Sequence, residues 1–155
     1  IHASADGSYA DFLVTPAPGS INPASQRVID EGLNFVQMKG NETFKLAVRT
    51  LTKDVVEILK KNSINAEDIP HFIPHQANYR IIKAVGDALK MTEEQVVVTV
   101  GKYGNTSAAS IPMAINDIYE SGRLKSGDLM LLDTFGGGLT WASALLPFAG
   151  KPIEQ

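Results

Sequence analysis

Apolar residues recur every three or four positions along three stretches of the chain, which is the spacing of an amphipathic helix. The longest stretch runs from about 41 to 62, with Asn41 as its expected N-cap. Its repeating apolar positions are Phe44, Val48, Leu51, Val55 and Ile58. The same spacing predicts shorter helices over about 78–90 and 108–121, the latter with Pro112 in its first turn. Helices of this kind bury their apolar face against a sheet or another helix.

Short runs of consecutive apolar residues separate these helices and predict buried strands. The runs are 69–74, 96–100, 129–133 and 139–148. Residues 1–21 are instead rich in Ser, Gly, Pro and Asp, which predicts a short strand followed by a surface excursion. Because helices alternate with short strands, the pattern favours an α/β fold with a mixed, mostly parallel sheet between helices.

The composition argues against several classes of function. With 155 residues, of which 44% are hydrophobic, the chain can form one domain with a true core. A formal net charge of −3 argues against a nucleic-acid partner, and no run approaches the roughly 20 apolar residues that span a bilayer. The sequence contains no Cys and only three His, so we expect no disulfide, no metal site and no cysteine nucleophile from this chain.

Three loops that follow predicted strands carry the candidate chemistry, since sites in such sheets form at the carboxyl ends of strands. His75 follows the first of these strands, Asn105 lies in the small-residue stretch 101–110, and residues 136–138 are three consecutive glycines. Taken alone, each has a simple structural explanation: a hydrogen-bonding histidine, a turn residue and a tight turn.

Taken together, three segments resemble the C-terminal half of β-ketoacyl-acyl carrier protein synthase III. They are His75-Gln76-Ala77-Asn78, Tyr103-Gly104-Asn105-Thr106-Ser107-Ala108-Ala109-Ser110 and Phe135-Gly136-Gly137-Gly138-Leu139-Thr140-Trp141. The separation of 30 positions between His75 and Asn105 also fits this family, as does the segment 38–45 ahead of the long helix. The likeness extends from about Asp6 to Phe148.

The resemblance implies a thiolase-like fold of two α/β halves, in which residues 1–155 form one half with a sheet between helices. The family's active site uses Cys, His and Asn, and the Cys belongs to the N-terminal half. Since this chain has no Cys and no initiator Met, we expect it to be the C-terminal domain only, as a fragment or as one of two chains. Alone, it should catalyse no condensation.

The implied reaction condenses a short acyl-CoA primer with malonyl-acyl carrier protein, with loss of CO2, at the start of fatty-acid synthesis. His75 and Asn105 would donate hydrogen bonds to the malonyl thioester oxygen, and the Gly137 N–H would hold a second oxyanion. Residues expected to line the pantetheine tunnel are Asn41, Phe44, Gln76, Ala77 and Asn78. Residues expected to dock the acidic carrier protein are Lys45, Arg80 and Lys83. The resemblance also implies a cytoplasmic homodimer that needs no cofactor.

Several alternatives stay open at this stage. The chain could belong to a related synthase of secondary metabolism, to a malonyl decarboxylase, or to a non-catalytic interaction module that keeps the fold. Ser107 or Ser110 could pair with His75 as a hydrolase nucleophile, although no G-x-S-x-G motif occurs. Asp128 and Asp133 are expected to be turn and strand-end residues. Asp87 and Ala88 stand where family members often carry a basic pair, which leaves the register of carrier-protein docking open.

Overall fold

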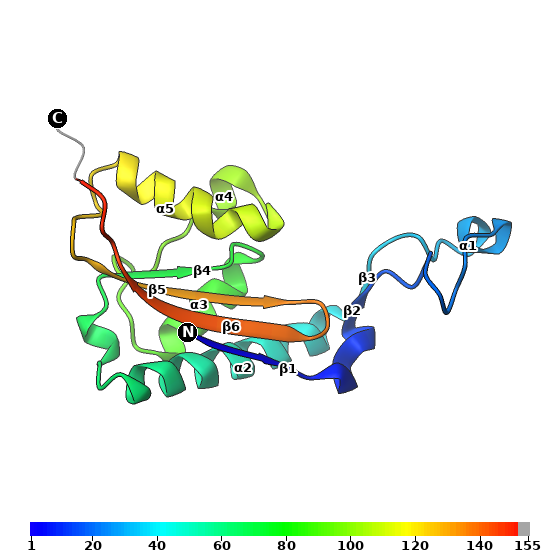
Figure 1. Ribbon diagram of the computed structural model, residues 1–155, viewed down its shortest axis with the longest axis horizontal. Helices are drawn as coiled ribbons and strands as arrows, with labels where there is room; N and C mark the ends of the chain where they lie inside the picture. The colour runs from blue at the N-terminus through cyan, green and yellow to red at the C-terminus, as the bar shows by residue number, and fades with distance from the viewer. Residues whose placement is uncertain (152–155) are drawn as a thin grey trace.

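The computed structural model describes residues 1–151, which form a four-stranded sheet with helices on both faces (Figure 1). The strands of this sheet, in chain order, are β1 (His2–Ala5), β4 (His71–Pro74), β5 (Leu129–Gly136) and β6 (Thr140–Pro147). A separate two-stranded ribbon joins β2 (Leu13–Val14) to β3 (Gln37–Met38). The helices are α1 (Gln26–Asp30), α2 (Gly40–Lys61), α3 (Tyr79–Ala88), α4 (Val100–Tyr103) and α5 (Ser110–Glu120), with 3-10 helices η1 (Gly7–Phe12), η2 (Ala66–Asp68) and η3 (Ser107–Ala109).

The sheet is mixed, as expected, but the prediction that it is mostly parallel was wrong. Its strand order is β1-β6-β5-β4, and only β4 and β5 run parallel, whereas β5–β6 and β1–β6 are antiparallel. The reason lies in the turn at 137–139. A parallel crossover needs about a dozen residues or more, so this short connection forces β5 and β6 into an antiparallel hairpin.

The predicted strand at 96–100 is reduced to one parallel bridge, between Val96 and Phe72. Beyond this bridge, the N–H groups of Thr99 and Val100 donate to the side-chain oxygen of Gln76, over 2.7 and 3.1 Å. Val100 then begins α4. A distant side chain therefore takes the N–H groups that a longer strand would have used, and it overrides the β-propensity of the valine run.

Each face of the sheet packs on its own helices, as Figure 1 shows: α2 and α3 cover one face, and α4 and α5 lie over the other. Neighbouring residues of β4 illustrate this arrangement. Phe72 packs with Val55 and Val85 in the first core, whereas Ile73 packs with Ile118 in the second. Because both faces of the sheet are buried, the two central residues of β4, Phe72 and Ile73, are both apolar, although their side chains point to opposite faces.

The three long helices form where the apolar periodicity predicts them, with one correction at an N-terminus. The first begins at Gly40 with Lys39 as its N-cap, so Asn41 is an exposed residue of the first turn and not the cap. The Lys39 N–H donates to the Phe12 carbonyl over 2.9 Å, which anchors this residue just before the helix starts. Pro112 is the third residue of α5 and therefore lies in its first turn, as predicted.

A surface excursion follows the first strand, as predicted, but it begins later and extends well past residue 21. Residues 15–36, which connect β2 to β3 and include α1, project away from the sheet and its helices in Figure 1. Their exposed apolar side chains include Ile21, Ile29, Phe35 and Val36. Across residues 1–151, no helix combines the length and the apolar character needed to cross a bilayer.

Candidate active site

Three of the predicted site segments lie toward one end of the sheet. Figure 1 shows the carboxyl end of β4, the turn between β5 and β6 and the N-terminal end of α2 at this end. His75 directly follows β4, and its N–H donates to the Asp133 carbonyl over 2.7 Å. This bond continues the parallel β4–β5 pairing by one residue, so the sheet itself fixes the backbone of His75.

The His75 imidazole is half-buried, and its Nδ1 lies 2.6 Å from the Oγ of Ser110. Ser110 is the first residue of α5 and is itself buried. Burial lowers the pKa of His75 below its ordinary value, because the charged ring loses hydration. The neutral imidazole is therefore the dominant form near neutral pH, and only one of its two nitrogens carries a proton.

Asn105 is exposed in the loop between α4 and η3. Its Oδ1 accepts the Ser107 N–H over 3.0 Å, which is the side-chain turn expected of an asparagine here. The turn uses only the oxygen, so the two N–H bonds of the carboxamide remain available to a substrate. The structural and the catalytic interpretations of Asn105 are therefore compatible.

The glycine turn brings an unhindered N–H to the same end of the sheet. Gly137 is exposed, and within residues 1–151 its N–H meets no acceptor. A Cβ at this position would lie 3.1 Å from the Leu13 carbonyl oxygen, so a side chain would crowd the neighbouring backbone. Gly138 has φ +138°, a conformation that residues with a Cβ rarely adopt. Both positions therefore favour glycine for a reason that the geometry supplies.

The expectation that Gln76 lines the tunnel was wrong. Its side chain is 1% exposed, and all of its hydrogen bonds go to backbone groups. Its Nε2 donates to the carbonyls of Pro74 and Val97, over 2.8 and 3.1 Å, and its Oε1 accepts the N–H groups of Thr99 and Val100. Gln76 therefore holds the end of β4 to the segment that leads into the Asn105 loop, and it offers no group to a substrate.

The other predicted contact residues lie on or beside α2 and α3. Phe44 is half-buried, and the Arg80 guanidinium lies over its ring, 5.2 Å from the centroid. Asn78 caps α3, because its Oδ1 accepts the Arg80 N–H over 2.8 Å. Ala77 is half-buried, and its N–H donates to the His75 carbonyl over 3.0 Å. Two predicted docking residues, Lys45 and Lys83, are exposed, and the latter pairs with Asp87 across 3.2 Å.

A buried acidic pair on the α2 face of the sheet was missed at the sequence level. Asp133 is 1% exposed in the middle of β5, not at a strand end, and neither carboxyl oxygen has a hydrogen-bond partner within residues 1–151. Burial, and then the nearby Asp54, raise the pKa of Asp133 well above its ordinary value. Asp133 lies two residues from both Leu131 and Phe135, which belong to the core, so the two-residue period of a strand could have predicted that it is buried.

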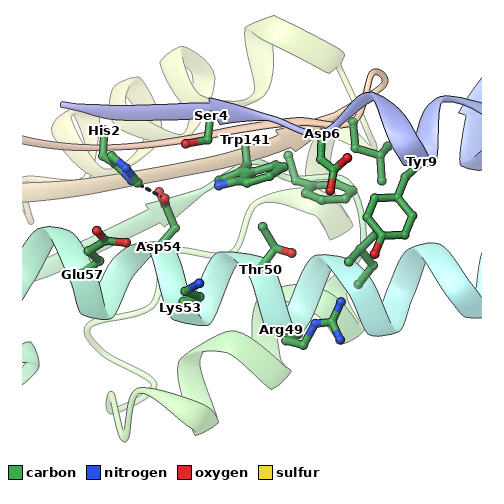
Figure 2. A pocket seen from close by; sticks show the side chains of 13 residues that line it. His2, Ser4, Asp6, Tyr9, Arg49, Thr50, Lys53, Asp54, Glu57 and Trp141 are labelled. Atoms are coloured by element: carbon green, nitrogen blue, oxygen red, sulfur yellow. Dashed lines mark hydrogen bonds and ion pairs between the residues drawn. The ribbon is translucent and has the colours of Figure 1, made fainter.

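Asp54 also borders a cavity of about 490 Å³ between β1 and α2, where it is hydrogen-bonded to His2 (Figure 2). Figure 2 shows Arg49, Lys53 and Glu57 along the same helix beside it. Neither His75 nor Asn105 lines this cavity. In residues 1–151, no three His, Asp or Glu side chains converge so as to hold a metal ion.

The buried Asp133 carboxyl predicts a pH-dependent loss of stability. Its folded pKa lies above its unfolded value, so the penalty is absent below about pH 4 and grows as pH rises toward the folded pKa. Asp133→Asn has no proton to lose there. We expect the unfolding free energy of this variant, measured by urea denaturation, to increase relative to that of the wild type as the pH rises from about 4 to neutral. A difference between the two proteins that does not change with pH would contradict this assignment.

In comparisons with known proteins, residues 59–148 match the protein-family model described as 3-oxoacyl-[acyl-carrier-protein (ACP)] synthase III C terminal. The β-ketoacyl-[acyl-carrier-protein] synthase III of Sulfurovum sp. (strain NBC37-1) is 86% identical over 155 residues, which are all of this chain and 46% of that protein. The protein of the same name from Helicobacter pylori (strain J99 / ATCC 700824) is 58% identical over 151 residues, 97% of this chain and 45% of its own. The chain thus spans about half the length of these curated relatives.

Solved structures give the same picture. The crystal structure of 3-oxoacyl-[acyl-carrier-protein] synthase III from Aquifex aeolicus VF5 matches with a TM-score of 0.81 and 39% identity, over 95% of this chain and 43% of that one. The synthase III structure from Thermus thermophilus matches with a TM-score of 0.83 and 39% identity, over 96% and 45%.

Proposed function

Because this chain belongs to the 3-oxoacyl-[acyl-carrier-protein] synthase III family, and matches the C-terminal part of its members, we propose that it supplies the decarboxylation half of a condensing active site. The proposed enzyme condenses a short acyl-CoA primer with malonyl-acyl carrier protein and releases CO2. The observation that carries the proposal is that His75 and the turn containing Gly137 lie at one end of the sheet (Figure 1), and that Ser110, in the helix that follows the Asn105 loop, contacts the His75 ring.

The nucleophilic thiol of the proposed enzyme comes from outside this sequence, which contains no Cys. We assign it to an N-terminal half, where a cysteine at a helix N-terminus would be favoured as thiolate. The primer acyl group leaves coenzyme A and forms a thioester with this cysteine. The proposal also includes a cytoplasmic homodimer that needs no cofactor. Both curated relatives carry the synthase III name, so a synthase of secondary metabolism and a non-catalytic module are not favoured.

The malonyl thioester then reacts through an enolate. His75 Nε2 and the Asn105 carboxamide donate hydrogen bonds to its carbonyl oxygen. As the carbon–carbon bond to CO2 breaks, its electron pair moves into the enolate, and the two preorganised donors stabilise the new negative charge. The enolate carbon attacks the acyl-cysteine, the Gly137 N–H holds the tetrahedral oxyanion, and collapse of this intermediate expels the cysteine thiolate.

Neutral side chains beside this site suit the amide groups of pantetheine. Asn41 and Asn78 lie in or next to the first turns of α2 and α3, where each keeps a carboxamide N–H for a ligand. We assign Phe44 and Ala77 to the wall of the tunnel, since both are half-buried near these turns. Gln76 is not assigned to the tunnel, because its side chain is buried and bonded to backbone groups.

Arg80 is the strongest candidate for carrier-protein docking, because its guanidinium is already ordered on the Phe44 ring. Arg80→Ala is expected to raise KM for malonyl-acyl carrier protein about tenfold with little change in kcat, and to weaken the dependence of KM on salt. Arg80→Lys should restore only part of the affinity, since an ammonium group does not stack in the same way. Lys61→Ala, at the other end of α2, is the control. Equal KM values for the Arg80→Ala and Lys61→Ala variants would exclude Arg80 from docking.

The proposed function is tested by combining this chain with an N-terminal half. We define the full-length synthase as residues 1–155 preceded by the N-terminal half of the Sulfurovum relative, which is 86% identical over this chain. It should form 3-oxoacyl product from an acyl-CoA and malonyl-acyl carrier protein, whereas residues 1–155 alone should form none. Product made by residues 1–155 alone, or none made by a folded full-length synthase, would refute the proposal.

A further inference from the structure

The Ser110 hydroxyl lies between two groups that belong to the His75 segment. Its Oγ is 2.6 Å from His75 Nδ1 and 3.2 Å from the backbone nitrogen of Gln76. Ser110 is 2% exposed, so bulk water does not compete for these contacts. Such a buried hydroxyl has to satisfy its hydrogen-bonding groups with the partners around it.

These two contacts fix the direction of the protons. The Gln76 N–H can only donate, so the Ser110 oxygen accepts from it. Among residues 1–151, the remaining partner of this hydroxyl is His75 Nδ1. If Nδ1 carried the proton, both neighbours would donate to Oγ and the hydroxyl proton would be buried without an acceptor, which is costly. Every group is satisfied only when the hydroxyl donates to Nδ1, which leaves the ring proton on Nε2.

A serine hydroxyl next to a histidine nitrogen also resembles the nucleophile and base of a hydrolase. The burial of Ser110 argues against that role, because an attacking oxygen has to reach the substrate carbonyl. Ser107, the other candidate nucleophile, is exposed and takes part in the Asn105 turn through its backbone N–H. The pair between His75 and Ser110 is therefore a contact on the side of the ring opposite to Nε2.

We propose that Ser110 is a positioning residue, which holds His75 as the tautomer protonated on Nε2 by donating its hydroxyl proton to Nδ1. The catalytic part of this inference rests on the proposed function, in which Nε2 donates to the malonyl thioester oxygen. The tautomer is a separate physical property of the ring and is measured without any substrate.

The arrangement also connects the two proposed side-chain donors. Ser110 begins α5, and the loop that carries Asn105 leads directly into this helix start. The Gln76 side chain in turn bonds the backbone at Thr99 and Val100, ahead of the same loop. A single hydroxyl therefore ties the orientation of the His75 ring to the segment that positions Asn105.

The experiment compares Ser110→Ala with Ser121→Ala in the full-length synthase. Both changes remove a serine hydroxyl from the α5 region, but the Ser121 hydroxyl donates to the Ile118 carbonyl, at the far end of the helix from His75. Nitrogen-15 NMR of labelled histidine, with His75 assigned by its loss in a His75→Gln variant, reports which ring nitrogen carries the proton. We expect Nε2 to be protonated in the wild type and in Ser121→Ala, and a mixture of tautomers in Ser110→Ala.

The kinetic expectation is that kcat for malonyl decarboxylation falls about tenfold in Ser110→Ala, with KM nearly unchanged, as for the loss of one well-placed hydrogen bond. A proton on Nδ1 in the wild type would overturn the inference, whether or not the variant folds. So would a tautomer and a kcat in Ser110→Ala equal to those of Ser121→Ala. A wild type with Nε2 protonated but no decarboxylation activity would instead refute the proposed function and leave the tautomer assignment standing.

Discussion

Replacing His75 by Ala in the full-length synthase is expected to lower kcat for malonyl decarboxylation by about 100- to 1,000-fold, the usual effect of removing one donor from an oxyanion site. The reason is that the enolate oxygen then keeps only the Asn105 carboxamide as a side-chain donor. Since the hydrogen bond strengthens as charge develops, the loss falls on kcat more than on KM. The rate at which labelled CO2 is released from malonyl-acyl carrier protein measures this fall in kcat.

The first half-reaction provides the internal control for this prediction. Acyl transfer from acyl-CoA to the cysteine requires the thiol but forms no enolate. We therefore expect the rate of acyl-cysteine formation in His75→Ala, followed by mass spectrometry of the intact protein, to stay within about tenfold of wild type. Equal losses in both half-reactions would mean that His75 acts on the cysteine or on folding, and would contradict its assignment to the enolate oxygen.

Much of the fold could be predicted because its signals are local. The helix at Gly40–Lys61 follows from an apolar period along its own sequence, and the burial of β4 follows from a short apolar run between prolines. The thiolase-like α/β fold expected from the resemblance is confirmed by the synthase III structures. A mostly parallel sheet was mispredicted because apolar runs show where strands lie but not how they pair.

The features of the site that were missed depend on bonds between residues far apart in the chain. Gln76 reaches Thr99, 23 positions away, and Ser110 reaches His75, 35 positions away, where the sequence suggested a nucleophile and its base rather than a buried contact. Neither bond leaves a periodic trace in the sequence. The resemblance suggested a substrate contact for Gln76, whereas the structure shows a side chain enclosed by backbone. Asp133 is different, because its position between two inward-facing apolar residues could have marked it as buried.

Gln76→Ala is expected to destabilise the protein by about 3 to 5 kcal/mol, one of the largest effects of any single change to this chain. The wild-type side chain satisfies four buried or half-buried backbone groups, at Pro74, Val97, Thr99 and Val100. Leaving a buried group unsatisfied costs about 1 to 3 kcal/mol, and water entering the space recovers part of it. Urea denaturation gives the total, and hydrogen exchange at the Thr99 and Val100 amides should show the loss locally.

Two further variants separate these hydrogen bonds from the loss of side-chain volume. Gln76→Glu keeps the shape but turns a carboxylate oxygen toward the carbonyls of Pro74 and Val97, so it should destabilise the protein as much as Gln76→Ala does. Gln37→Ala removes an exposed glutamine and should change stability by less than about 0.5 kcal/mol. A Gln76→Glu variant as stable as the wild type would show that the two bonds to the Pro74 and Val97 carbonyls contribute little to stability. The link between the end of β4 and the backbone ahead of the Asn105 loop would then rest on the Thr99 and Val100 bonds to the side-chain oxygen and on the Ser110 contacts with the His75 segment.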